Sequence, residues 1–244
     1  MDWNKSKNII LVILLITNIF LIAVYGGGSF VQKKSENNNA YQYTMNVLEE
    51  NNIVYKGKIY NKLPKMTTLT VSYGKYDRNL VQKNIQNTRS LPQADRNEPG
   101  YKNSADDLIE RCGFMSENVV YEGISDDGAS TVVSYSNVYK NIPIEECYMR
   151  VYFENGRITD FERKWMEVVS EGDSRIEVTS QLSALLEFMT ETDKSKQITV
   201  DDMYLVYWID NYDVDGGILY DTALPAWCIR YNGDDLKYIS ATVQ

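Results

Sequence analysis

The side chains that most enzymes use for acid–base or nucleophilic catalysis are scarce in this sequence. None of its 244 residues is a histidine. This excludes Ser-His-Asp and Cys-His nucleophile activation, histidine-ligated zinc and histidine acid–base catalysis. The known serine-nucleophile, Walker and dinucleotide-binding fingerprints are also absent from the sequence. An enzyme built on this chain would depend on carboxylates, serines, lysines or tyrosines.

Acidic residues form the only clusters that could support catalysis or metal binding. Three adjacent pairs could supply the two carboxylates of a glycoside hydrolase: Asp126-Asp127, Asp201-Asp202 and Asp234-Asp235. Residues 211–216, NYDVDG, match the first half of a calcium loop, but its twelfth position is Thr222 instead of Glu. Solvated pairs and an acidic turn are the favoured interpretations. We therefore expect no catalytic residues, no metal and no cofactor.

The cysteines and aromatic residues favour packing over chemistry. Cys112, Cys147 and Cys228 are odd in number, lack CxxC spacing and lie within apolar patterns. Buried free thiols are expected, and a Cys147–Cys228 disulfide is the alternative. The 19 tyrosines and four tryptophans are most simply read as packing on half-buried sheet faces. A platform for glycan or peptide is the alternative.

Composition narrows the class of partner. The chain carries 25 Lys and Arg residues against 34 Asp and Glu residues, a formal charge of −9. This acidity argues against nucleic acid as a partner. Hydrophobic and charged contents of 43% and 24% are typical of a globular protein.

The N-terminal region predicts a membrane anchor. Residues 9–25 are apolar except for Thr17 and Asn18, and no charge occurs between Asn8 and Val31. About 20 residues at ~1.5 Å each span a bilayer of ~30 Å. We predict a cytoplasmic tail (1–8), a transmembrane helix (9–28) and a linker (29–40). A cleaved signal peptide is the alternative.

Two features of this anchor predict its orientation and its contacts. The α-amino group adds to the lysines of the tail, which favours a cytoplasmic N-terminus and an extracytoplasmic remainder, in a single-pass protein of the cell membrane. Leu14, Asn18 and Leu21 share one helix face. An amide in hydrocarbon favours a hydrogen-bonding partner helix. These three residues are the candidate transmembrane contact.

The remaining chain predicts an α+β fold with antiparallel sheets, in two subdomains over 41–170 and 171–244. Helical spacing starts at Tyr41, after Asp77, at Ser104 (ending near Gly113) and over 178–189 with Thr179 or Ser180 as cap. Alternation predicts strands over 53–60, 69–73, 118–124, 131–139, 146–153, 158–161, 198–209, 227–231 and 236–239. Asn155-Gly156 and Asn232-Gly233 predict tight hairpins. Residues 88–103 are expected to form an exposed loop.

Short segments at the two ends of the chain resemble a known family. Asp2, Trp3, Lys7 and Asn18, with Pro225, Ala226 and Trp227, resemble the YycI (WalI) family. The resemblance implies a membrane-anchored accessory protein of low-GC Gram-positive bacteria, without catalysis or cofactor. Its partners would be the WalK sensor histidine kinase, which controls cell-wall metabolism, and the companion protein YycH. Whether such an accessory protein inhibits or activates the kinase differs between species.

The resemblance and the composition together predict a non-enzymatic regulator of a two-component system. The alternative is an anchored glycan-binding module or hydrolase at the cell wall. Converging carboxylates in an exposed pocket would favour the alternative, and a flat apolar patch would favour the regulator.

Overall fold

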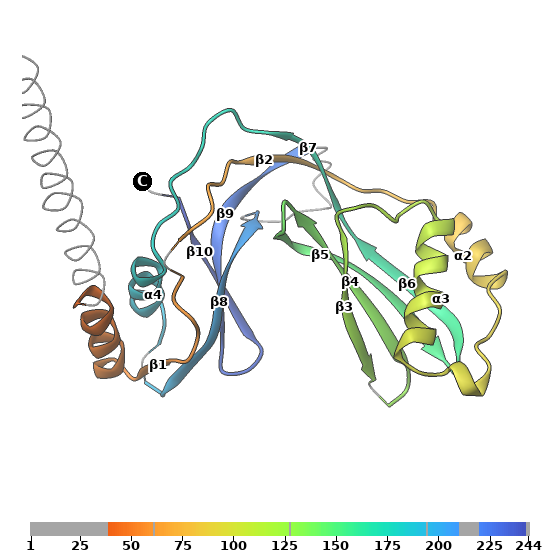
Figure 1. The fold of residues 1–244 in the computed structure, drawn as a ribbon, viewed down its shortest axis with the longest axis horizontal. Coiled ribbons are helices and arrows are strands. Elements are labelled where there is room, and N and C mark those ends of the chain that lie inside the picture. The colour runs from red at the N-terminus through yellow and green to blue at the C-terminus, as the bar shows by residue number, and fades with distance from the viewer. Residues whose placement is uncertain (1–38, 61, 127, 194, 210–219, 243–244) are drawn as a thin grey trace, which may run out of the picture.

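The computed structural model describes residues 39–60, 62–126, 128–193, 195–209 and 220–242 as an α+β fold (Figure 1). The described part has a ten-stranded mixed sheet and four helices, at residues 39–50, α2 (Arg78–Gln86), α3 (Glu98–Arg111) and α4 (Gln181–Thr190). None of the described helices is long and apolar enough to cross a membrane. The predicted anchor 9–28, with Leu14, Asn18 and Leu21, lies outside the described residues, as do Asp2, Trp3 and Lys7.

The sheet is mostly antiparallel, with strand order β3-β4-β5-β8-β9-β2-β7. Three further strands pair beside this path: β1 with β8, β6 with β5 and β10 with β9. The strands are β1 (Ile53–Tyr55), β2 (Leu69–Tyr73), β3 (Val119–Asp126), β4 (Thr131–Tyr139), β5 (Ile142–Glu154), β6 (Arg157–Lys164), β7 (Met166–Glu171), β8 (Ile198–Trp208), β9 (Tyr220–Tyr231) and β10 (Asp235–Ser240). Among these strands of the described residues, the parallel pairs are β1–β8 and β5–β8.

Two lobes share this sheet (Figure 1). We define the first lobe as β3–β6 with α2 and α3, and the second lobe as β1, β8, β9 and β10 with α4 and the 39–50 helix. β2 and β7 cross from one lobe to the other at one end of the molecule. The 39–50 helix and β1 pack in the second lobe, although both precede the subdomain boundary predicted near residue 170. Ile53 of β1 pairs with Ile198 of β8, and Leu48 shares a core with Leu185.

Each lobe has its own apolar core beneath its helices. The first core contains buried side chains of α2, α3 and β4–β6, and it continues under β2 and β7. The second core joins the 39–50 helix and α4 to β8–β10, with Phe188 and Trp227 among its largest buried side chains. In both lobes the helices lie on the side that faces away from the other lobe (Figure 1).

Several helix ends and turns follow the predicted residues. Asp77 caps α2 by accepting from the backbone N–H of Asn79, and Ser180 caps α4 by accepting from Ser183. Both predicted hairpins are confirmed, because Asn155 and Gly156 have φ of 51° and 78°, and Asn232 and Gly233 have 51° and 93°. Two successive positive φ angles match the right-handed twist of the flanking strands.

The expected exposed loop over 88–103 is wrong in its second half. A 3₁₀ turn, η1 (Gln93–Asp95), leads into α3, whose N-cap is Asn97 and not Ser104. The Asn97 side chain accepts from the Gly100 N–H at 3.0 Å, and Pro99 stands in the first turn, where its missing N–H costs nothing. The predicted strand over 53–60 is also shorter, since β1 ends at Tyr55.

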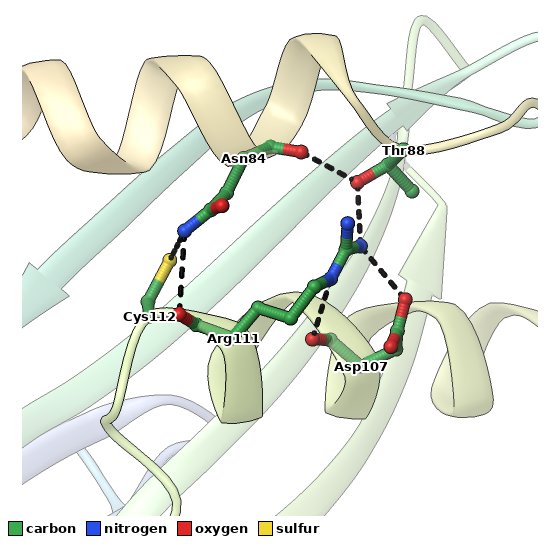
Figure 2. Close-up of polar contacts among 5 residues, drawn as sticks. All are labelled: Asn84, Thr88, Asp107, Arg111 and Cys112. Atoms are coloured by element: carbon green, nitrogen blue, oxygen red, sulfur yellow. Dashed lines mark hydrogen bonds and ion pairs between the residues drawn. The ribbon is translucent and has the colours of Figure 1, made fainter.

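A polar network ties α2 to the end of α3 (Figure 2). Arg111 donates to Thr88 Oγ1 at 2.8 Å and pairs with Asp107 at 2.7 Å. Asn84 Nδ2 donates to the Arg111 carbonyl at 3.4 Å and lies 3.3 Å from Cys112 Sγ. The Arg111 carbonyl at the C-terminal end of α3 thus accepts a hydrogen bond. The network holds the two helices together, and its side chains do not form a catalytic set.

Candidate functional site

The candidate site is the face of β8–β10 that none of the described helices covers. We call it the aromatic face and define it as Tyr204, Val206, Trp208, Ala226, Cys228 and Tyr238. The register places Tyr204, Cys228 and Tyr238 in one row, and Val206 beside Ala226 in the next. The Trp208 and Tyr238 rings stack, with centroids 5.4 Å apart and planes within 14°.

Strand alternation explains why this face exists. Met203, Trp227 and Ile229 point into the second core, so their neighbours in sequence point the other way. Val206, Ala226 and Cys228 are fully buried on that side, beneath the half-buried rings of Tyr204, Trp208 and Tyr238. The strands therefore carry apolar residues on both faces, which is unusual for a surface sheet.

The aromatic face meets the first lobe at Glu145. Tyr238 Oη donates to Glu145 Oε2 at 3.0 Å, which joins β10 of the second lobe to β5 of the first. Just before this residue, Ile144 pairs with Tyr207 of β8, and from Tyr148 onward β5 pairs with β6. Glu145 thus lies where β5 of the first lobe comes beside β8 of the second lobe.

The electrostatics of this junction are dominated by burial. Burial raises the pKa of the Glu145 carboxyl, and nearby Glu146 and Glu122 raise it further, while the hydrogen bond from Tyr238 lowers it. Burial also raises the pKa of the Cys228 thiol to about 11 and the pKa values of the Tyr204 and Tyr238 hydroxyls. The thiol and the hydroxyls of the face are therefore protonated at neutral pH.

The first lobe also has a face outside the cover of its described helices, made of polar and aromatic side chains. Met149 and Val151 of β5 point into the first core, so Tyr148, Arg150 and Tyr152 point the other way. The Arg150 guanidinium lies 4.3 Å from the Tyr148 ring centroid. Tyr152 Oη donates at 2.8 Å to Glu162, which also lies 4.0 Å from Arg150.

The predicted acidic pairs serve local structure where the structure describes them. Asp201 accepts from the Gly233 N–H at 2.9 Å, and Asp202 lies 3.5 Å from Arg230. Asp234 and Asp235 are exposed at the β9–β10 turn. At the β3–β4 turn, the Asp126 carboxylate accepts a hydrogen bond from the Gly128 N–H. Asp127 and the calcium-like segment 211–216 fall outside the described residues. Within the described part of the chain, no group of three or more His, Cys, Asp or Glu side chains could hold a metal ion.

The Pro225-Ala226-Trp227 segment lies in the middle of β9. Trp227 is 1% exposed, packs in the second core and donates from Nε1 to the Thr179 carbonyl at 3.0 Å. Its predicted packing role is thus confirmed. Ala226 lies on the aromatic face, and its small size leaves room for Trp208 to reach Tyr238. The cysteines Cys112, Cys147 and Cys228 are all buried and free.

Tyr204, Trp208, Tyr238 and Glu145 belong to no motif in the sequence that would mark them as functional. The available signal was the run 203–209, which is apolar or aromatic at consecutive positions where a half-exposed strand would alternate. That pattern indicates a strand covered on both faces. The contact with Glu145, 93 residues from Tyr238, left no signal in the sequence.

Comparison with known protein families and with curated proteins finds no match for this chain.

Proposed function

We propose that this chain is a membrane-anchored, non-enzymatic accessory regulator of a sensor histidine kinase of the WalK type. Its partners would be the kinase and a YycH-like protein, contacted through the transmembrane helix and the extracytoplasmic region. The observation that carries the proposal is the aromatic face, a half-buried surface of tyrosine and tryptophan at the junction of two lobes. Aromatic residues of this kind are enriched in protein interfaces.

The sequence supplies independent support. The N-terminal residues and the Pro225-Ala226-Trp227 segment resemble the YycI family, and the resemblance rests on these end segments. Lack of histidine removes the commonest catalytic side chain. The hollow of about 280 Å³ beside α2 is lined by Asp160 and Glu162, but also by Arg78. Glu162 is already engaged by Tyr152 and Arg150, which does not favour a general acid.

The proposal includes a specific organisation. The anchor 9–28 and linker 29–40 would hold the described region outside the cell, and the two lobes would correspond to two α+β subdomains. Regulation would then be a coupling free energy. Contacts with the chain would favour one conformational state of the kinase, and only the difference in affinity between states can signal.

A membrane two-hybrid assay tests this proposal directly. The full chain is paired with the sensor kinase and with the YycH-like protein of the same organism, as wild type, Trp208→Ala and Tyr220→Ala. Tyr220 is a matched control because it is aromatic, on β9 and 59% exposed, but lies outside the aromatic face. We expect association for the wild type and the control, and weaker association for Trp208→Ala at equal membrane levels.

The opposite result would favour another class of function. If no kinase or YycH-like partner associates, while the full chain retains cell-wall glycan and Trp208→Ala loses it, the chain is an anchored glycan-binding module.

A further inference from the structure

The lysines of this acidic chain are distributed unevenly. Residues 51–76 contain five lysines and no Asp, Glu or Arg residue. The rest of the chain carries 20 Lys and Arg residues against 34 Asp and Glu residues, a formal charge of −14. A basic segment of this length in an otherwise acidic chain favours an anionic partner for that segment.

Four of these lysines belong to an exposed segment between β1 and β2. We call it the basic strip and define it as Lys56, Lys58, Tyr60, Lys62 and Lys65, all of which are exposed. The Tyr60 side chain is 50% exposed. Among the ion pairs of the described residues, none involves a lysine of the strip. These four ammonium groups are therefore available to an anion from outside the chain.

Hydrogen bonds to α4 hold the middle of the basic strip against the second lobe. Gln181, only 2% exposed, accepts from the Tyr60 N–H at 2.6 Å and donates to the Lys58 carbonyl at 3.0 Å. The Tyr55 hydroxyl donates to the same carbonyl at 2.8 Å. The backbone of the strip is thus fixed here, while the side chains of Lys58 and Tyr60 are exposed.

The same surface lies beside the start of the first described helix. Burial raises the pKa of the Tyr55 hydroxyl, and three nearby groups raise it further: Asp202, Tyr60 and Tyr41. Tyr41 and Tyr60 thus both lie close to Tyr55. Tyr41 and Tyr43, near the start of that helix, are 37% and 68% exposed. Exposed tyrosines beside lysines fit a membrane–water interface, where aromatic rings and basic groups both bind favourably.

The proposed anchor would keep this surface close to the membrane. Ten residues, 29–38, separate the end of the anchor from the first described helix. Even a fully extended segment of this length reaches only ~36 Å. That helix and α4 lie together at the end of the molecule opposite α2 and α3 (Figure 1). The lobe that carries the basic strip would therefore be the one next to the membrane.

We propose that the basic strip binds the headgroups of anionic phospholipids at the surface of the membrane that holds the anchor. The inference rests on the proposed membrane anchorage, and it adds a lipid contact that regulation of the kinase does not require. A lysine near an anionic surface increases the affinity for that surface about fivefold. Because the tether makes this contact intramolecular, such modest contributions suffice to hold the second lobe at the membrane. The acidic remainder of the chain is repelled by the same headgroups, which directs the first lobe away from them.

Fluorescence quenching on the full chain in lipid nanodiscs tests this contact. A fluorophore at Gln42→Cys, an exposed position beside Tyr41 and Tyr43, reports the approach of the helix start to nitroxide-labelled headgroups. The native cysteines are buried, so labelling is directed to the new site. The discs contain phosphatidylcholine alone or together with phosphatidylglycerol. We expect stronger quenching with phosphatidylglycerol, and a return to the phosphatidylcholine level as salt is raised, because salt screens exposed charges.

Neutralising the basic strip should remove this dependence on lipid charge. The single change Lys58→Gln should lower the ratio of docked to undocked chain about fivefold in discs with phosphatidylglycerol. Equal quenching in both kinds of disc is expected for the chain that combines Lys56→Gln, Lys58→Gln, Lys62→Gln and Lys65→Gln.

A matched control removes the same charge at exposed positions outside the basic strip. This chain combines Lys75→Gln, Lys83→Gln, Arg89→Gln and Arg157→Gln. It should respond to phosphatidylglycerol as the wild type does. The salt dependence is measured on the wild type, so the test does not depend on the folding of any variant.

Two results would overturn the lipid contact: equal quenching of the wild type in the two kinds of disc, or an undiminished response after the four lysines of the strip are replaced. Neither result bears on kinase association, which the two-hybrid assay measures separately. A chain that does not co-elute with the discs would refute the anchor, and this inference with it.

Discussion

At the scale of single residues, Trp227 anchors the second core. Its side chain is 1% exposed and its indole N–H is satisfied by the Thr179 carbonyl. Trp227→Ala should cost ~3–5 kcal/mol of unfolding free energy, because it leaves a cavity and removes the donor to a partly buried carbonyl. Urea denaturation measures this. Trp208→Ala is the matched comparison and should cost less, because Trp208 is only partly buried.

The cysteines give a second prediction at this scale. All three are buried and free, and burial raises the pKa of the Cys147 thiol to about 12 and that of Cys228 to about 11. Since the thiolate is the reactive species, a maleimide should modify none of them in the folded chain at neutral pH. In denaturant without reductant, all three should react. Modification of Cys112 alone under those conditions would instead reveal a Cys147–Cys228 disulfide.

At the scale of elements, the start of α3 separates two candidate caps. Asn97→Ala should destabilise the chain by about 1 kcal/mol, because the Gly100 N–H loses its acceptor. Ser104→Ala should be neutral or slightly stabilising, because Ser104 lies inside the helix, where alanine is the better helix former. Thermal denaturation of both variants measures the difference. A larger loss for Ser104→Ala would place the helix start where the sequence pattern placed it.

The elements that the sequence predicted well are those specified by local chemistry. The Asp77 and Ser180 caps and the two Asn-Gly turns depend on neighbours a few residues away. The local sequence is therefore sufficient to predict them. The start of α3 was missed because Pro99 and Gly100 resemble a loop, although proline fits the first helical turn. An alanine at Gly100 would place its Cβ 1.9 Å from the Asp95 carbonyl oxygen, so that glycine is required by a close approach and marks no loop.

At the scale of the whole molecule, the arrangement of the lobes depends on contacts between distant segments. β9 pairs with β2 through residues 220–223 and with β8 through the rest of its length, so it joins β2 to β8 within the sheet. β1 joins β8 in parallel, which pairs Ile53 with Ile198. Hydrophobic periodicity predicts where each strand lies in the sequence but not which strand it pairs with. For this reason neither the aromatic face nor its contact with Glu145 could be predicted from the sequence.

The anchor carries a prediction at the same scale. If Asn18 lies against a partner helix, Asn18→Leu should keep membrane insertion, because leucine is favourable in hydrocarbon. It should weaken co-purification of the kinase or the YycH-like protein by up to roughly tenfold, since interhelical polar contacts are worth ~0.6 and at most ~2 kcal/mol. Detergent pull-down measures this, with Ile13→Leu as the lipid-facing control. Equal recovery for all three chains would leave the described region as the recognition surface.

We propose that this chain changes the activity of a sensor kinase without chemistry of its own. The most direct measurement is the autophosphorylation rate of that kinase in proteoliposomes, with and without the full chain inserted beside it. We predict a changed rate that depends on the amount of chain and is reduced in extent by Trp208→Ala. An unchanged rate, with both proteins shown to be inserted and folded, would contradict the account.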